Sequence, residues 1–216
     1  MRIVLVPAER VVRWVENVAT RHGATTLAVR DGALHGVAED GSTFVASLPL
    51  EQAYDGAPDA AAFADAVRAT PPADWGVLLV RKGGFAVARL SGSAITASKV
   101  GQRHVQGRTK AGGQSQQRFA RRRDNQARQA YEAAAEHAVR ILGGLGGPVV
   151  VGGDKGALDE VLEDPRLRHL RPTGTRLPVP DPRRAVLEAA VEDALSARMS
   201  VTNSDASVPG AAGGVG

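Results

Sequence analysis

A short glycine-rich segment in the middle of the chain carries the residue types best suited to chemistry. Gly112 and Gly113 permit backbone conformations and close approaches that a side chain would block, and Gln114 follows them directly. A glutamine side chain offers both a hydrogen-bond donor and an acceptor, so it can orient a water molecule without being a strong base. Backbone N–H groups near a helix start can stabilise the oxyanion that forms when water attacks an ester. The triplet is therefore suited to hydrolysis in which positioning provides much of the acceleration, but by itself it means little and needs the context of the residues around it.

Basic residues surround this triplet. Between Trp75 and Arg123 the sequence has no aspartate or glutamate, although the formal net charge of the whole chain is only +4. A short basic run is usually just a solvated surface, but a segregated stretch of this length predicts a polyanionic partner whose phosphates the arginines hold. The basic residues nearest to the triplet are Arg103, Arg108, Lys110, Arg118, Arg121, Arg122 and Arg123, and those further upstream are Arg81, Lys82, Arg89 and Lys99.

The composition excludes several other kinds of site. The chain has no cysteine, which rules out disulfides, thiolate catalysis and cysteine-based zinc sites. No set of histidines and carboxylates has metal-ligand spacing, so we expect neither a metal nor a cofactor. No apolar run is long enough to cross a bilayer, and the run at the N-terminus is too short for a signal peptide. We therefore expect a cytoplasmic protein without a membrane partner.

Three further patterns are better explained as structure than as chemistry. His104 lies near the triplet and could serve as a general base, but a lone histidine on a strand is more often structural. Asp154 and Lys155 follow a glycine pair but lack the Lys-Ser/Thr ending of a phosphate-binding loop, so they predict a strand-to-helix turn. A Ser-His-Asp triad has no support, because the sequence contains no Gly-x-Ser-x-Gly elbow.

The first third of the chain predicts a small α+β region, residues 1–74. Apolar residues at helical spacing predict a helix over residues 7–22, which Gly23 ends. Asp31 and Gly32 form a two-residue hairpin signal between two strand candidates. The prolines that follow Thr70 break a second helix and suggest a boundary near residue 74. The predicted strands are 25–30, 33–38 and 43–48, and the second helix is 58–69.

The remainder predicts an α/β region with a mixed sheet, residues 75–199. Three apolar segments joined by glycine turns predict a meander, and a polar loop at residues 107–113 then leads into a long helix without glycine or proline. Residues 200–216 have almost no charge and predict a disordered tail. The predicted strands are 75–81, 85–90, 94–100, 148–151 and 177–179, with 103–106 as an extension of the sheet, and the predicted helices are 115–142, 157–162 and 182–199.

Two sets of short motifs in this region resemble those of known families. The first set lies around the triplet and consists of Gly107-Arg108, Gly112-Gly113-Gln114-Ser115, Arg118-Phe119-Ala120-Arg121 and Arg123; the second lies in the meander and consists of Val80-Arg81-Lys82-Gly83-Gly84 and Ser98-Lys99-Val100-Gly101. The first set resembles the catalytic loop in the middle domain of archaeal and eukaryotic class-I peptide release factors. The second is more similar to the Vms-like release factors of ribosome quality control, in an actinobacterial-type branch. Together the two resemblances cover roughly residues 75–200.

The resemblance implies a release-factor middle-domain-like core with a small N-terminal α+β extension, to which no motif assigns a role. It implies that Gln114 is the catalytic glutamine of a peptidyl-tRNA hydrolase. Vms-like proteins vary the spacing around this residue, so Gln116 is the alternative. The implied partners are peptidyl-tRNA and the ribosome, in particular its large subunit. Because the N-terminal extension carries no codon-reading motif, we expect activity that ignores the codon in the ribosomal A site.

Two other functions fit the same residues. A loop of arginine, lysine and glutamine can stabilise a phosphorane as readily as an acyl oxyanion, so cleavage of the tRNA near its 3′ end would also free a nascent chain. A module that binds RNA or the ribosome without catalysis, with the glycine loop as a contact arm, is the second alternative.

Overall fold

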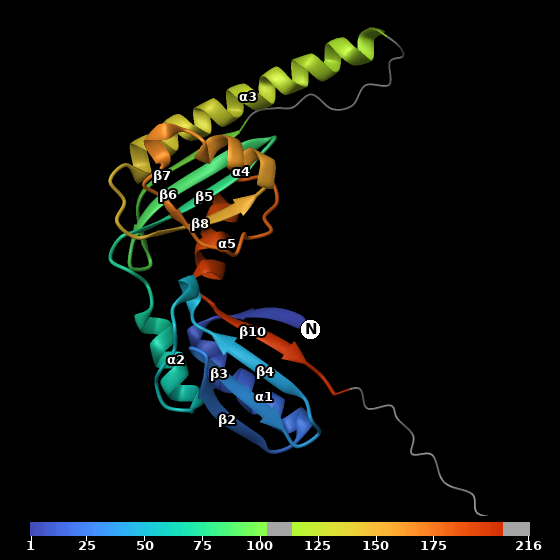
Figure 1. The fold of residues 1–216 in the computed structure, drawn as a ribbon, viewed down its shortest axis with the longest axis vertical. Helices are drawn as coiled ribbons and strands as arrows, with labels where there is room; N and C mark the ends of the chain where they lie inside the picture. Colours follow the sequence, from blue (N-terminus) through green and yellow to red (C-terminus); the bar gives the residue numbers. More distant parts are fainter. Residues whose placement is uncertain (103–113, 205–216) are drawn as a thin grey trace, which may run out of the picture. The chain divides into compact units, whose positions relative to one another are not determined.

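The computed structural model describes residues 1–102 and 114–204, and for residues 102 and 114–126 it describes the backbone alone. The chain forms two compact units. The N-terminal unit combines Met1–Ala69 with the chain from Ser196 onward, and the central unit is Thr70–Leu195. Each unit has a five-stranded sheet of its own (Figure 1). The predicted mixture of helices and mixed sheet is therefore present.

An antiparallel sheet in the order β1-β10-β4-β3-β2 forms the base of the N-terminal unit. Its apolar side chains share one core with those of two helices, and Phe44 and Phe63 are among the largest fully buried residues there. The hairpin predicted at Asp31 and Gly32 is confirmed, because both residues have left-handed φ angles, 49° and 72°, and join two antiparallel strands. The elements are β1 (Arg2–Val6), η1 (Ala8–Arg10), α1 (Val11–His22), β2 (Thr25–Arg30), β3 (Ala33–Ala38), β4 (Thr43–Ser47), η2 (Pro49–Glu51), α2 (Ala60–Ala69) and β10 (Ala197–Thr202).

The end of the chain differs from the sequence prediction. The last helix ends at Ala194 instead of reaching residue 199, and residues 200–202 belong to strand β10 instead of a disordered tail. Strand β10 lies between β1 and β4, and its residues Ala197 and Met199 are completely buried. The alternation of Arg198, Met199, Ser200 and Val201 has the period of a strand with one buried face. Residues 205–216 lie outside the described part of the chain.

The central unit contains the predicted meander. Its sheet has the order β7-β6-β5-β8-β9, in which β5, β6 and β7 are successive antiparallel neighbours and β8 runs parallel to β5. The strand expected at residues 177–179 is reduced to a single bridge between Leu177 and Gly152. The elements are β5 (Trp75–Arg81), β6 (Gly84–Ser91), β7 (Ala94–Gln102), α3 (Gln114–Leu142), β8 (Pro148–Gly153), α4 (Lys155–Leu162), η3 (Pro165–Leu167), β9 (Arg171–Pro172) and α5 (Arg184–Ala194).

Helices cover both faces of this sheet (Figure 1). Strands β7, β8 and β9 run parallel, and the connections through α3 and α4 cross the sheet in the same direction. Right-handed crossovers therefore place α3 and α4 on the same face, where Leu78, Val80 and Val151 are buried beneath them. Helix α5 packs on β5 and β6 from the other face. Among the described helices, none is both long and apolar enough to cross a bilayer.

Candidate functional site

The Gly-Gly-Gln segment lies at the junction between β7 and α3. Gly112 and Gly113, together with Arg103, Arg108 and Lys110, fall outside the described residues, as does His104. Gln114 is the first residue of α3. Gln116, Arg118, Arg121, Arg122 and Arg123 follow in the opening turns of the same helix, where the backbone alone is described. The structure therefore defines the site through the two elements on either side of the loop.

Helix α3 supports the end of the loop that carries Gln114. The helix has 29 residues, which corresponds to a length of about 43 Å. Its second half packs on the sheet through small side chains, of which Ala134 and Ala138 are fully buried, and Leu142 completes the contact. Its opening turns run past the edge of the sheet (Figure 1). The predicted catalytic glutamine thus stands at the projecting tip of an element whose other half is fixed in the core.

An arginine fixes the docked half of α3 to the segment that follows α4. The Arg166 Nη2 atom donates to Glu136 Oε1 of α3 and to Asp164 Oδ2, each at 2.7 Å, and its Nε atom donates to Asp164 Oδ1 at 3.0 Å. These bonds from Arg166 lower the pKa of the Asp164 carboxyl to about 2. Arg166 and Glu136 are exposed to solvent and Asp164 is half-buried, so the cluster orients the helix more than it stabilises the fold.

An aromatic contact joins β7 to α3. Phe85 lies opposite Gly101, next to the end of β7, and a Cβ atom on that glycine would overlap the Phe85 ring. The His137 ring of α3 stacks on the other side of Phe85, with a centroid distance of 5.4 Å and an interplanar angle of 27°. Burial lowers the pKa of the His137 imidazole, and the nearby Arg140 and Lys99 lower it further. The stack therefore joins the end of β7 to the docked half of α3.

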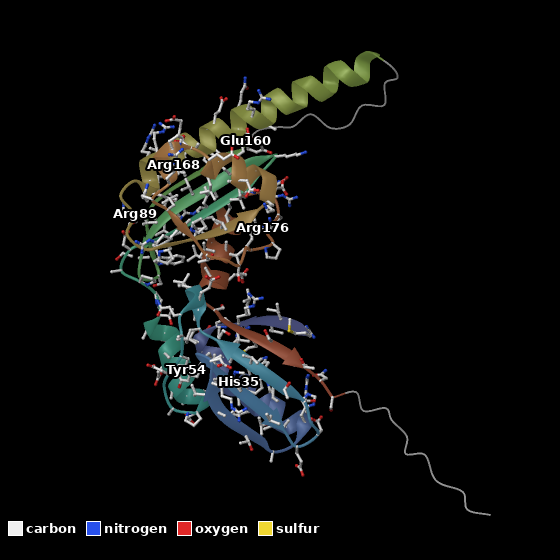
Figure 2. All side chains as sticks on the ribbon, viewed as in Figure 1. His35, Tyr54, Arg89, Glu160, Arg168 and Arg176 are labelled. Atoms are coloured by element: carbon white, nitrogen blue, oxygen red, sulfur yellow. The ribbon has the colours of Figure 1, made fainter. Side chains whose placement is uncertain are left out.

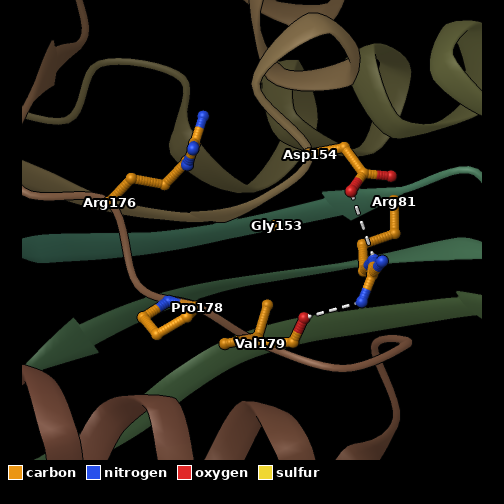
Figure 3. A pocket seen from close by; sticks show the side chains of 6 residues that line it. All are labelled: Arg81, Gly153, Asp154, Arg176, Pro178 and Val179. Atoms are coloured by element: carbon orange, nitrogen blue, oxygen red, sulfur yellow. Dashed lines mark hydrogen bonds and ion pairs between the residues drawn. The ribbon is translucent and has the colours of Figure 1, made fainter.

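A cavity of about 440 Å³ opens at the carboxyl edge of the central sheet (Figure 3). Because β7 runs parallel to β5 and β8, the loop that contains the triplet leaves the sheet from this same edge. Crevices at the carboxyl ends of parallel strands are the usual ligand sites of α/β sheets. The residues that line the cavity are Arg81, Gly153, Asp154, Arg176, Pro178 and Val179.

Arg81 is one of two arginines that line this cavity. Its Nη1 atom donates to the carbonyl oxygen of Val179 at 3.1 Å, and its Nε atom lies 3.4 Å from Asp154 Oδ1 and 3.9 Å from Asp181 Oδ1. The Nε atom is buried but makes no hydrogen bond, because neither carboxylate has the required geometry. Arg176, on the opposite wall, makes no ion pair within the described part of the chain. Since Arg81 already faces two carboxylates, Arg176 is the cation of this lining that could receive an anionic group.

Sequence reasoning identified Asp154 as a turn residue but missed its contact with Arg81. The turn itself is confirmed, since β8 ends at Gly153 and α4 begins at Lys155. At Gly153 the φ angle is 103°, and a Cβ atom would overlap the carbonyl oxygen of Val80, so the glycine is required there. The sequence did contain a signal for this contact. Asp154 directly follows a glycine pair that ends a buried strand, and a residue in that position lies at the carboxyl edge of the sheet.

Arg89, in contrast, has a structural role within the basic stretch (Figure 2). Its Nε and Nη2 atoms donate to the two carboxylate oxygens of Asp74 at 2.7 and 2.9 Å, and its Nη1 atom donates to the carbonyl oxygen of Gly143 at 3.1 Å. The hydrogen bonds from Arg89 lower the pKa of the Asp74 carboxyl. Arg89 thus binds the start of β5 to the end of α3 and is not available for a partner.

A serine, a histidine and an aspartate meet in the N-terminal unit without forming a triad. Asp40 Oδ2 lies 2.8 Å from His22 Nδ1, and Ser42 Oγ lies 3.2 Å from the same nitrogen. A triad requires the serine and the carboxylate on different ring nitrogens, so this cluster is a structural clamp. Within the described residues, no three His, Cys, Asp or Glu side chains are grouped to hold a metal ion.

The comparisons with known proteins concern mainly the central unit. The Actinobacteria/chloroflexi VLRF1 release factor family matches residues 73–200, which include the Gly-Gly-Gln segment. The crystal structure of Archaeoglobus fulgidus Pelota is similar with a TM-score of 0.27 and 9% sequence identity, over 89% of this chain and 63% of the Pelota chain. This chain thus spans less than two thirds of Pelota. No curated protein matches the sequence. Because the family match extends over more than half of the sequence, the chain belongs to the Actinobacteria/chloroflexi VLRF1 release factor family.

Proposed function

We propose that the protein is a peptidyl-tRNA hydrolase that frees nascent chains from ribosomes in rescue or quality control. Membership of a release factor family links the chain to translation and the ribosome. The observation that carries the finer assignment is the position of Gly112-Gly113-Gln114. The triplet lies inside the family match, and its glutamine is the first residue of α3, whose opening turns carry the arginines.

In the proposed reaction, the Gln114 side chain orients a water molecule on the carbonyl carbon of the peptidyl ester. Attack forms a bond between the water oxygen and that carbon, and backbone N–H groups beside Gly113 stabilise the oxyanion of the tetrahedral intermediate. The bond to the ribose oxygen then breaks, and a proton from the water ends on that oxygen. The products are a peptide with a free carboxylate and a tRNA with an intact 3′-terminal ribose.

The contacts that hold the second half of α3 in place support this proposal. A catalytic group that acts by positioning must be held against a rigid element. Ala134, Ala138 and Leu142 fix that half of the helix in the core, and Arg166 restrains it from outside. Arg176 in the cavity lining adds a cation at the edge of the sheet from which the loop leaves, so it is a candidate contact for a tRNA phosphate.

Product analysis tests the proposal most directly. Ribosomes stalled with peptidyl-tRNA would be treated with the protein, and the 3′ end of the tRNA and the C-terminus of the peptide would be examined by mass. We expect an intact tRNA and a free peptide carboxylate. Gln114→Ala should reduce the release rate by about two to three orders of magnitude, the usual loss for a transition-state donor, with little change in binding. Gln117→Ala, in the same helical turn, is the matched control and should keep its activity.

The same experiment separates the other candidates. A tRNA shortened at its 3′ end would show that the protein cleaves the tRNA endonucleolytically and does not hydrolyse the ester. Binding without turnover on every ribosomal substrate would leave a non-catalytic module. If Gln116→Ala abolishes release while Gln114→Ala does not, the catalytic role moves to Gln116.

A further inference from the structure

A groove runs between α1 and β1 in the N-terminal unit. It consists of two adjoining cavities of about 500 and 470 Å³, which share Val4, Trp14 and Asn17 in their walls. Its apolar floor includes Val18 and Val201. The groove lies almost entirely outside the part of the chain that matches the release factor family, so the release activity does not account for it.

Four arginines surround this groove, although the N-terminal unit has more acidic than basic residues. Arg10, the last residue of η1, and Arg21 of α1 lie on the same helical stripe as Trp14. Arg13 directly precedes Trp14 on α1, and Arg2 lies on β1. All four arginines are exposed, and none of their side chains forms an ion pair or hydrogen bond with another described residue. Glu9 and Glu16 line neither cavity. The complete set of arginines is Arg2, Arg10, Arg13 and Arg21.

Trp14 provides a rigid wall in the middle of the groove. Its ring meets Phe44 edge to face, with a centroid distance of 5.1 Å and an interplanar angle of 90°. The residue is half-buried, and within the described residues its indole N–H has no hydrogen-bond partner. This N–H is not buried, so a ligand can accept a hydrogen bond from it.

Strand β1 forms the second wall and is an unprotected edge strand. It pairs only with β10, and its outer N–H and C=O groups bond to no other residue in the described ranges. Proteins usually protect such edges with proline, lysine or a bulge, none of which occurs within Arg2–Val6. Instead the strand is apolar, and Ile3 and Leu5 are 44% and 37% exposed. An edge of this kind is suited to pairing with an added strand.

We infer that this groove binds an extended acidic peptide segment, which adds to β1 as a further strand. Its backbone would satisfy the outer groups of β1, its apolar side chains would contact Val4 and Trp14, and its carboxylates would pair with the four arginines. RNA would use the arginines and the Trp14 ring but would leave the strand edge and the valine floor without partners. A second copy of the chain, paired through β1, would bring the same arginines face to face. The acidic peptide therefore fits more of the surface than either.

The test is a titration of the 15N-labelled full-length chain followed by NMR. The probes are the octapeptide (Glu-Val)4, its counterpart (Lys-Val)4 and the RNA octamer U8. We expect (Glu-Val)4 to shift the amide signals of β1 and α1 and the indole N–H of Trp14. It should also slow hydrogen exchange at the outward amides of β1 by tenfold or more, because only strand addition protects those groups. We expect (Lys-Val)4 to leave these signals unchanged.

Charge-reversed variants provide the control. Arg13→Glu combined with Arg21→Glu should weaken (Glu-Val)4 binding by tenfold or more, whereas Arg30→Glu on β2, at the opposite edge of the sheet, should change it by less than twofold. The spectrum of each free variant shows whether it is folded. Equal binding of both peptides, absence of shifts at β1, or equal losses in Arg30→Glu would overturn the proposal. Shifts at these residues with U8 but not with (Glu-Val)4 would make the groove an RNA site. Neither result bears on peptide release, which is measured separately.

Discussion

Phe85 is the residue on which the geometry of the candidate site most depends. It packs against Gly101 of β7 on one side and the His137 ring of α3 on the other, so one buried side chain fixes the elements at both ends of the loop. An aromatic ring over a cross-strand glycine also occurs in the N-terminal unit, where Phe44 covers Gly36. In both sheets the missing Cβ provides the space that the ring occupies.

Replacing Gly101 with alanine tests this contact. The added methyl group would overlap a Phe85 ring that His137 prevents from moving away, and overpacking of this kind costs about 1–3 kcal/mol. We expect the free energy of unfolding in denaturant to fall by this amount and peptide release to slow. Gly146→Ala is the matched control, because a Cβ atom there meets nothing within 4 Å. Equal stability of the two variants would mean that the ring is free to shift.

His137 predicts how stability depends on pH. Its pKa is lowered in the fold, first by burial and then by Arg140 and Lys99, from an ordinary value of 6.5. Below that value the unfolded chain binds the proton more strongly than the folded chain does, so stability falls as the pH drops through 6.5 and levels off below the folded pKa. We expect chemical denaturation between pH 8 and 5 to show a smaller decline for His137→Gln than for the wild type. If the free energy of unfolding declines equally with pH in both proteins, His137 is not the cause of the decline.

Among the elements, helix α3 has two halves that differ in composition and packing. The half that follows residue 126 is rich in alanine and packs closely on the sheet, which its small side chains allow. The half that precedes it carries Arg118, Arg121, Arg122 and Arg123. Residues three and four apart lie on the same face of a helix, so Arg118 shares a face with Arg121 and Arg122. One element thus combines a core-packing segment with a segment suited to an RNA backbone.

Removing two charges from this helix start tests its contact with RNA. Arg118→Gln combined with Arg121→Gln should weaken ribosome or tRNA binding and reduce the salt slope by about one for each phosphate that the helix no longer binds. Arg168→Gln combined with Arg171→Gln removes the same charge from an exposed part of the same unit and should leave the slope unchanged. The measurement is binding affinity over a range of salt concentrations. An unchanged slope in the α3 variant would exclude an RNA-facing helix start.

At the scale of the whole molecule, the two units differ in charge. The central unit contains the basic stretch and most of the release factor match, whereas acidic residues outnumber basic ones in the N-terminal unit. Strand β10 completes the N-terminal sheet after the chain has passed through the central unit. The central unit is thus inserted between two segments of the N-terminal unit, and removal of β10 would take away an inner strand of the N-terminal sheet and leave β1 without its partner.

We expect the release activity to ignore the codon in the ribosomal A site. The N-terminal unit has no motif that we can assign to codon reading, and the proposed chemistry needs only the central unit and peptidyl-tRNA. Release would be compared on ribosomes stalled at a stop codon, on ribosomes stalled at a sense codon and on isolated large subunits with peptidyl-tRNA. We expect the two stalled ribosomes to give equal rates and the isolated subunits to be substrates. A strong preference for stop codons would identify a decoding element and make the protein a termination factor.

The features that depend on residues close together in the chain could be predicted from the sequence. The turn at Asp31 and Gly32, the meander from Trp75 onward and the long helix to Leu142 follow from local backbone preferences and from the period of apolar residues. The family resemblance, which the comparison confirms, also rests on a contiguous segment. The roles of Gln114 and of the loop remain predictions, because they concern chemistry instead of fold.

The features that join distant parts of the chain could not be predicted from the sequence and became visible in the three-dimensional structure. Strands β1 and β10 pair across nearly the whole sequence, so residues 200–202, which were expected to be disordered, lie inside a sheet. The approach of Asp154 to Arg81 and the stacking of His137 on Phe85 likewise join residues far apart in the sequence. The physical reason is that a short strand gains its stability from its partners, through cross-strand hydrogen bonds and burial of one face, and the identity of those partners is not encoded in its own residues.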